Sequence, residues 1–187
     1  MDFFTSSWNL NHFGIIKYTN RPFNSVEEMN NRLIQNCNDH VKEDDRLFFV
    51  GDMVFGPLDD AKYLKTVRYF RNKINCKNIF LIYGNHDRRA RKVAEFRRHF
   101  VNCSDYLEIK SNEQSIILFH YPIEEGCWNR SSAGAWHVHG ASRKLDKTAN
   151  SLEHKRFDVS VDNCKEILGS NRPEDYRPFS YIELSNI

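Results

Sequence analysis

Carboxylate, amide and imidazole side chains recur in this sequence where short apolar runs end. Groups of this kind stand at Asp52, at Asn85 and His86, and at His120. A Gly-Asp pair alone is common in turns, and a single histidine at a strand end usually serves as a hydrogen-bonding group. Ligands of open α/β sheets bind beyond the carboxyl ends of the strands. The three places together therefore predict one binding site that offers oxygen and nitrogen donors.

The elements that must position these groups follow from the alternation of apolar runs and amphipathic stretches, which is typical of α/β folds. The expected strands are residues 3–6, 47–50, 79–83, 115–119, 135–140 and 157–161. The expected helices are residues 25–38, 59–72 and, as a candidate, 88–100. The first helix begins with the capping box Ser25-Val-Glu-Glu28. The second should bury Ala61, Leu64, Val67 and Phe70 along one face.

Length and composition predict one soluble domain over residues 1–187. The chain has 187 residues, 40% of them hydrophobic, and a formal charge of +2, which is too small to indicate binding to extended nucleic acid. Its five cysteines are odd in number and contain no C-x-x-C, so we expect reduced thiols. No apolar run approaches the roughly 20 residues that span a bilayer, and no signal peptide is evident. We expect a cytoplasmic protein without a membrane partner.

The order of these motifs resembles that of the calcineurin-like metallophosphoesterases, in particular small members of phage and bacterial type. Gly51-Asp52, Gly84-Asn85-His86-Asp87 and the Phe-His-Tyr-Pro segment around His120 carry the resemblance. It implies an α/β sandwich of two mixed β-sheets flanked by helices. In that family two divalent metal ions are held by an Asp-x-His, the Gly-Asp aspartate, the Gly-Asn-His-Asp asparagine, a separate histidine and a Gly-His-x-His.

The sequence departs from this pattern at four of the implied metal-ligand positions. They are Ser7, Asn9, Ala141 and Arg143. One metal would then keep only Asp52, whereas the other would keep Asp52, Asn85 and His120 as a weak or vestigial site. Two-metal hydrolysis is therefore not expected. The alternative is a mononuclear phosphoesterase that uses one Mn²⁺ or Zn²⁺, with His86 as the acid.

A shifted register at the last motif is a second alternative, because His137 and His139 also form an H-x-H pair. The register through Gly140-Ala141-Ser142-Arg143 is preferred, because the shifted one places Trp136 where the motif has glycine. His139 nevertheless stays among the candidate ligand-binding residues. The substitutions at positions 7 and 9 remain in either register.

Basic and aromatic residues near the motifs extend the candidate ligand site. Arg143 could neutralise Asp52 and hold a phosphate through its planar fork of donors, or it could simply point into solvent. Arg88 opens a run of six cations within residues 88–98, a pattern that usually marks a solvated face. Trp8 and Trp128 lie in expected loops, so we expect at least one of them at the rim of the pocket, although core packing is the usual fate of tryptophan.

The favoured function is a pseudoenzyme that binds and sequesters a phosphate-containing ligand. A nucleotide or a cyclic nucleotide immune messenger is the expected ligand, which would make the protein an anti-defence sponge if a phage encodes it. A third class is a structural or protein-partner role with a vestigial pocket. A homo-oligomer that completes the pocket from a second chain also stays open.

Overall fold

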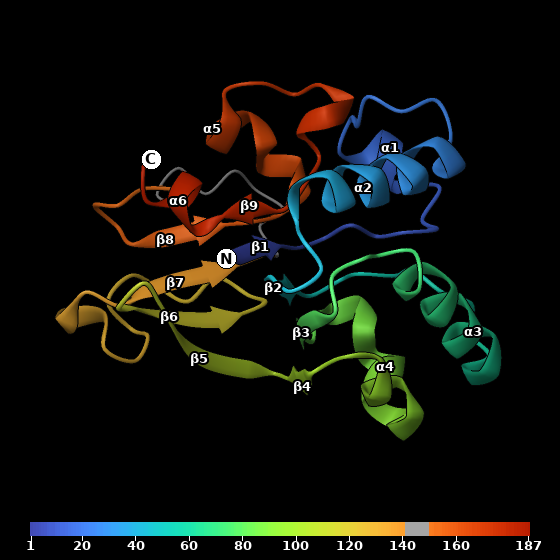
Figure 1. Cartoon of the computed structure of the whole chain (residues 1–187), viewed down its shortest axis with the longest axis horizontal. Coiled ribbons are helices and arrows are strands. Elements are labelled where there is room, and N and C mark those ends of the chain that lie inside the picture. The colour runs from blue at the N-terminus through green and yellow to red at the C-terminus, as the bar shows by residue number, and fades with distance from the viewer. Residues whose placement is uncertain (141–149) are drawn as a thin grey trace.

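Two mixed β-sheets form the centre of the molecule, which is a computed structural model that describes residues 1–140 and 150–187 (Figure 1). The first sheet has the strand order β4-β3-β2-β1-β9. Its strands are β1 (Asp2–Thr5), β2 (Arg46–Val50), β3 (Asn78–Ile82), β4 (Asn102–Ser104) and β9 (Phe179–Ser180). Strands β1 to β4 are parallel, whereas β9 runs antiparallel to β1. The parallel strands end at one common edge.

The second sheet has the order β5-β6-β7-β8. Its strands are β5 (Tyr106–Ser111), β6 (Gln114–Phe119), β7 (Trp136–His139) and β8 (Arg156–Asp158). Strand β5 is antiparallel to β6, while β6, β7 and β8 are parallel. Buried residues of both sheets, such as Phe48 and Val138, belong to one hydrophobic core. The expected α/β sandwich of two mixed sheets is therefore confirmed.

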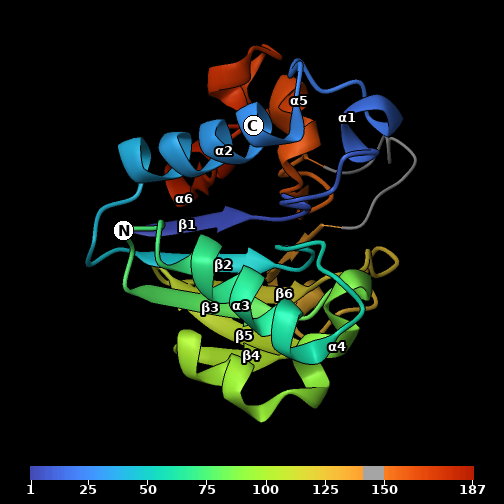
Figure 2. The same ribbon diagram turned by 90° about the vertical axis from the view of Figure 1, so that its right-hand side faces the viewer.

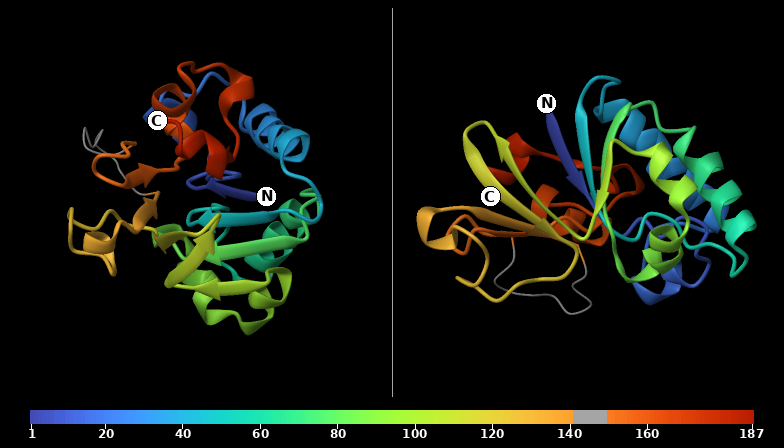
Figure 3. Two further views of the ribbon diagram at one scale, coloured as in Figure 1. Left: turned by 60° about the vertical axis from the view of Figure 1, so that its left-hand side comes forward. Right: turned by 90° about the horizontal axis from the view of Figure 1, so that it is seen from below.

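The α-helices are α1 (Ile15–Tyr18), α2 (Val26–His40), α3 (Asp60–Arg71), α4 (Arg88–Lys92), α5 (Cys164–Leu168) and α6 (Tyr181–Leu184). Helices that include α2 and α3 lie on the side of the first sheet away from the second sheet (Figure 3), whereas Tyr181 of α6 stacks on Trp136 of β7. Short 3-10 turns are η1 (Asn85–Asp87), η2 (Ala94–His99), η3 (Ser131–Ala133), η4 (Val161–Asn163) and η5 (Pro173–Asp175). Within the described ranges no helix is both long enough and apolar enough to cross a bilayer.

The start of α2 confirms the predicted N-cap at Ser25. The Ser25 hydroxyl accepts a hydrogen bond from the Glu28 N–H at 3.1 Å. The Glu28 carboxylate reaches one residue further back than a standard capping box and accepts from the Asn24 N–H at 2.8 Å. Both bonds satisfy backbone donors that have no partner inside the helix, so they fix where the helix begins.

Helix α3 lies within one residue of the predicted range at each end, but its buried face only partly matches the prediction. Asp59 caps it by accepting from the Lys62 N–H at 2.8 Å. Tyr63 is buried with Val67 and Phe70, whereas Ala61 is exposed. The prediction at Ala61 is wrong because the large Tyr63 ring, which stacks with Phe96 at 6.2 Å, rotates the buried stripe toward its own side.

Residues 88–100 form two short turns instead of one helix. Helix α4 ends at Lys92, the backbone is extended at Val93, and the 3-10 turn η2 follows. Neighbouring like charges destabilise a helix. Packing of Phe96 against Phe100, with ring centroids 5.0 Å apart, favours the second turn.

Candidate functional site

The loops that follow β1 and β2 run side by side and form the base of the site (Figure 2). The Ser7 N–H donates to Gly51 O at 2.9 Å, and the Asn9 N–H donates to Asp52 O at 2.9 Å. The Phe55 N–H then donates back to Leu10 O at 2.8 Å. These bonds continue the pairing of the two strands beyond the sheet, so the polar side chains of both loops share one edge.

Left-handed backbone positions direct the side chains of these loops. Ser7, Asn9 and Asp52 have φ values of 57°, 49° and 59°. Asn and Asp tolerate this region better than most residues because their short polar side chains hydrogen-bond locally, whereas serine has less such preference. Gly51 has a φ of 89° and lies so close to His120 that an added Cβ would stand 2.2 Å from the ring. Glycine at position 51 thus allows the histidine to enter the site.

Three acceptor atoms converge at the centre of the site. His120 Nε2 lies 3.5 Å from Asp52 Oδ2 and 3.2 Å from Asn85 Oδ1. His120 Nδ1 lies 2.7 Å from Val50 O, which only accepts, so the proton belongs on Nδ1 and the lone pair of Nε2 faces the other two groups. Burial lowers the pKa of His120, and the Asp52 carboxylate acts against this shift. Three acceptors that face one another repel each other, so a cation or a hydrogen-bond donor between them would be stabilising.

Asp87 joins the loop after β2 to the loop after β3. Its Oδ2 accepts hydrogen bonds from the Gly84 N–H at 2.8 Å and from the Asp52 N–H at 2.9 Å. The side chain is fully buried, and burial together with the charge of Asp52 raises its pKa to about 7. The Asp52 Oδ1 atom in turn accepts from the His86 N–H at 2.9 Å. Asp52 and its neighbours are therefore preorganised by backbone bonds.

Ser7 and Asn9 lie beside this centre as neutral groups. The Ser7 hydroxyl donates to Gly140 O at 2.8 Å, and the Asn9 Nδ2 donates to Ser7 O at 3.0 Å. Asn9 Oδ1 is buried and has no hydrogen-bond partner among the described residues. An unpaired buried acceptor is costly, so this position favours a ligand that brings a hydroxyl or an N–H group.

A cavity of about 820 Å³ opens over these groups. It is lined by Ser7, Asn9, His12, Ile15, Tyr18, Thr19, Asp52, Asn85, His86, Tyr121, Gly140 and Asp162. Ser7, Asn9, Asp52, Asn85 and His86 are thus brought together as predicted, and the wholly buried His120 lies directly behind them.

The sequence analysis missed an aromatic rim on this cavity. Tyr18 and Tyr121 are exposed and line the cavity, and the His12 ring lies 4.1 Å from the Phe55 ring. His86 joins this group with its ring centroid 5.6 Å from that of Phe55. The available signal was the position of His12 just before the short helix α1 and of Tyr18 at its end, since α1 follows directly from the first site loop.

The prediction that at least one of Trp8 and Trp128 lies at the pocket rim is wrong. Trp8 is buried, donates to Thr5 Oγ1 at 2.7 Å and packs edge-on against Phe49, because the left-handed residues on each side turn it into the core. Trp128 is buried in a separate small cluster and donates to Ala135 O at 2.8 Å. Neither side chain lines the cavity, so both are core residues.

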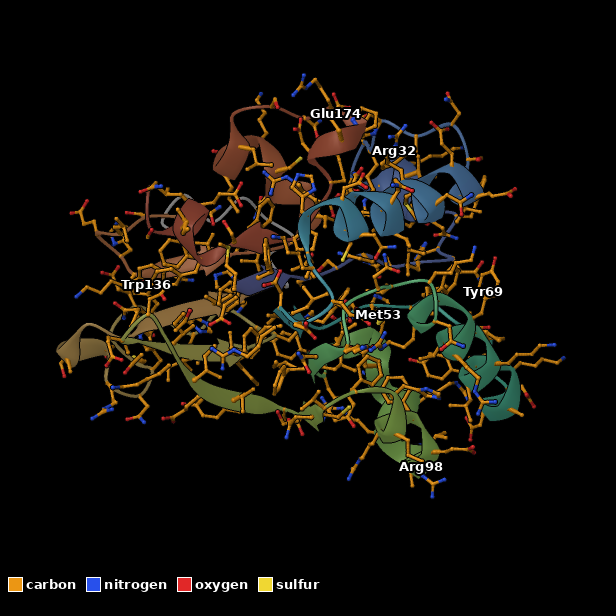
Figure 4. The ribbon with its side chains drawn as sticks, in the orientation of Figure 1. Arg32, Met53, Tyr69, Arg98, Trp136 and Glu174 are labelled. Atoms are coloured by element: carbon orange, nitrogen blue, oxygen red, sulfur yellow. The ribbon has the colours of Figure 1, made fainter. Side chains whose placement is uncertain are left out.

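The remaining basic and histidine candidates lie outside the cavity or outside the described residues. Arg88 is exposed and does not line the cavity, and Arg98, in the same cationic run, points outward from η2 (Figure 4). His139 is buried in β7 with its ring centroid 5.1 Å from that of His137. Ala141 and Arg143 belong to residues 141–149, which the structure does not describe.

Few donors that could hold a cation lie together in the described part of the chain. No group of three His, Cys, Asp or Glu side chains in residues 1–140 and 150–187 is arranged to hold a metal ion. Asp52, Asn85 and His120 nevertheless offer a carboxylate, an amide and an imidazole nitrogen, and His120 has the backbone partner on its other nitrogen that metal-binding histidines usually show. These three donor types are compatible with a divalent ion such as Mn²⁺ or Zn²⁺.

Comparisons with known proteins agree with the fold. A sequence profile of calcineurin-like phosphoesterases matches residues 19–172. An uncharacterised protein of Methanocaldococcus jannaschii is 33% identical over 135 residues, which cover 72% of this chain and 65% of that protein. The chain therefore spans just under two thirds of the length of this relative.

Among solved structures, a protein of unknown function from Aquifex aeolicus superposes with a TM-score of 0.66 and 20% identity over 100% of this chain and 98% of that one. An archaeal phosphodiesterase superposes with a TM-score of 0.49 and 15% identity over 90% of this chain and 87% of that one. The superposition on the Aquifex protein extends the likeness of fold over the whole chain.

Proposed function

This chain belongs to the calcineurin-like phosphoesterase family, and from that premise we propose that its cavity binds a phosphate-bearing ligand without cleaving it. The observation that carries the proposal is the state of Ser7 and Asn9. Both stand where the family resemblance implies metal ligands, and both are neutral side chains that donate to the backbone at 2.8 Å and 3.0 Å. Without those ligands a second metal ion has no carboxylate except Asp52.

A phosphate group fits the side of the cavity that Asn85 and His86 line. The His86 side chain is 30% exposed and lies beside Asp52, with 3.9 Å between Nε2 and Oδ2. Its ring and the Asn85 amide offer donors to phosphate oxygens, and Arg143 is proposed to add the cation. Such donors bind a phosphate ester, but they do not generate the metal-bound hydroxide that two-metal enzymes use for hydrolysis.

The rest of the cavity favours a nucleotide over a bare phosphate. Tyr18 and Tyr121 offer exposed ring faces on which a base can stack. The unpaired Asn9 Oδ1 matches a sugar hydroxyl, which donates a hydrogen bond. In a cell that signals through nucleotides or cyclic nucleotides, a protein of this kind would lower the free concentration of the messenger and act as a sponge.

The test is whether the protein retains a nucleotide without hydrolysing it. The protein is incubated with nucleotides, cyclic dinucleotides and cyclic ADP-ribose isomers, with and without Mn²⁺, and is then filtered and denatured. Chromatography of both fractions should recover an intact nucleotide from the retained protein. An Asn85→Ala/His86→Ala variant should retain less, whereas His40→Ala, which changes an exposed histidine on α2, should behave as the unchanged protein. Unchanged filtrates for the whole panel would contradict the proposal.

The convergence of Asp52, Asn85 and His120 favours a second candidate, a phosphoesterase that uses one Mn²⁺ or Zn²⁺. When bound there, the cation would polarise a phosphoryl oxygen. His86 would protonate the leaving group from its position at the cavity edge. In the same assay, metal-dependent products that disappear in both Asp52→Ala and His120→Ala would support this candidate and overturn retention without turnover.

A further inference from the structure

An open groove of about 500 Å³ adjoins the main cavity across Phe55. It is lined by Asn11, Phe55, Gly56, Pro57, Lys62, Lys65 and Thr66. The Phe55 ring lies 4.1 Å from the His12 ring, and His12 lines the main cavity. The cavity and the groove are therefore both lined by the loops that follow β1 and β2. One extended ligand can reach from the cavity into the groove around the Phe55 side chain.

The charged side chains that line this groove are both lysines. Lys62 and Lys65 lie three positions apart on α3, so they project from the same side of the helix. Their nearest acids in sequence have other partners, because Asp60 pairs with Arg89 at 2.5 Å and Asp59 caps the helix. No ion pair joins either lysine to an acid in the described parts of the chain. The groove is thus a local concentration of unneutralised positive charge.

The wall of the groove is held in place by close packing. Gly56 lies so near Tyr63 that an added Cβ would stand 2.3 Å from its ring. The Tyr63 ring is buried and stacks on Phe96, so it cannot move aside easily. This contact keeps the turn at Gly56 and Pro57 against the first half of α3. The distance between Phe55 and the two lysines is therefore set by packed side chains rather than by a free loop.

We propose that this groove binds a second phosphate of the same ligand, which would then be a dinucleotide whose phosphates lie on opposite sides of Phe55. The inference rests on the proposed function, since the first phosphate and its base occupy the main cavity. Lys62 and Lys65 bind the second phosphate as point charges, and Thr66 offers a hydroxyl. Two adjacent phosphates, as in ADP, stay on one side of the ring and do not reach the lysines.

The experiment compares AMP, ADP and the linear dinucleotide pApA by isothermal titration in the presence of a chelator. The unchanged protein should bind pApA about tenfold more tightly than AMP, because two charge-assisted contacts are added at a partly exposed site. The Lys62→Ala/Lys65→Ala variant should lose that gain and bind AMP and ADP as before. A Lys73→Ala/Lys77→Ala variant removes the same charge beyond the far end of α3 and should keep the preference.

The outcomes separate this inference from the function on which it rests. If AMP binds but pApA gains nothing, or if the gain persists in Lys62→Ala/Lys65→Ala, the second phosphate subsite is wrong and the main cavity remains a nucleotide site. If neither AMP nor pApA binds the unchanged protein, the proposed function fails and the subsite with it. Circular dichroism of each variant checks that a loss of the preference for pApA over AMP does not reflect unfolding.

Discussion

Arg21 and Asp162 form a bidentate ion pair directly beneath the first site loop. The Nε and Nη2 atoms of Arg21 lie 2.8 Å from the two carboxylate oxygens of Asp162. The same guanidinium donates to Ser7 O at 2.7 Å and to Trp8 O at 2.8 Å. One buried side chain thus ties the loop after β1 to η4, and it holds a backbone that includes the left-handed residue Ser7.

Replacing Arg21 should destabilise both the fold and the site. Arg21→Met leaves Asp162 and two backbone carbonyls without their donor, so the free energy of unfolding should fall by about 3 kcal/mol. Arg21→Lys keeps the charge but not the fork, and should lose a smaller amount. Urea denaturation measures both. The matched control is Lys77→Ala, which breaks the exposed pair with Glu43 and should leave stability nearly unchanged, because solvent screens such a pair. An equally small effect of Arg21→Met would contradict this role.

His137 should make stability depend on pH below neutrality. Its Nε2 accepts from the Ile123 N–H at 3.1 Å, and burial lowers its pKa from 6.5 to about 4. Between about pH 4 and pH 6.5, His137 is therefore protonated in the unfolded chain but neutral in the folded chain. Stability from this group is complete above pH 6.5 and is lost as the pH falls toward 4, by on the order of 3 kcal/mol.

The measurement is the free energy of unfolding from pH 8 to pH 4. His137→Gln should flatten the curve in that window, although other buried histidines leave a residual slope. His40→Gln changes an exposed histidine and should reproduce the curve of the unchanged protein. Identical slopes for His137→Gln and the unchanged protein would show that His137 is not the titrating group.

The aromatic rim should distinguish nucleotides from sugar phosphates. Tyr18→Ala and Tyr121→Ala each remove a stacking surface at the cavity, so affinity for AMP should fall about fivefold to tenfold. Affinity for ribose 5-phosphate, which has no base, should stay unchanged. Tyr69→Ala removes an exposed tyrosine from the outer side of α3 (Figure 4) and is the control. Equal losses for AMP and ribose 5-phosphate would contradict stacking.

The sequence predicted the centre of the site because strand ends determine it. Once β2, β3 and β6 are recognised as strands, the residues that follow them must meet at the edges of the two sheets, which places Asp52, Asn85 and His120 together. Helix α2 can also be placed from local sequence, since the Ser25 cap marks its start and Met29, Leu33 and Cys37 mark its buried face.

The surroundings of the site depend on long-range contacts that no local pattern contains. Strand β9 has only two residues and exists because Phe179 pairs with Phe4 across almost the whole chain. Its loop position made Trp8 a candidate for the pocket rim, but the left-handed backbone on both sides turns it inward. Tyr121 reaches the rim through the loop that His137 binds, a contact that depends on tertiary structure.

Restoring acidic and imidazole groups at positions 7 and 9 should restore metal binding. Asp and His belong to the residue types that tolerate the φ values of 57° and 49° found there, so Ser7→Asp/Asn9→His should fold. Without metal the new carboxylate loses the Ser7 bond to Gly140 O and faces Asp52. The free energy of unfolding should therefore fall by about 1 to 3 kcal/mol.

Mn²⁺ should reverse that loss, because an ion that binds only the folded state stabilises it in proportion to its affinity. Thermal denaturation with and without Mn²⁺ should show a rise in Tm for Ser7→Asp/Asn9→His that exceeds the rise for the unchanged protein. Ser7→Ala/Asn9→Ala loses the same two side-chain bonds without gaining ligands, and its Tm should not respond more than that of the unchanged protein. If the Tm of Ser7→Asp/Asn9→His also fails to respond to Mn²⁺, the neutral residues at positions 7 and 9 are not what limits metal binding.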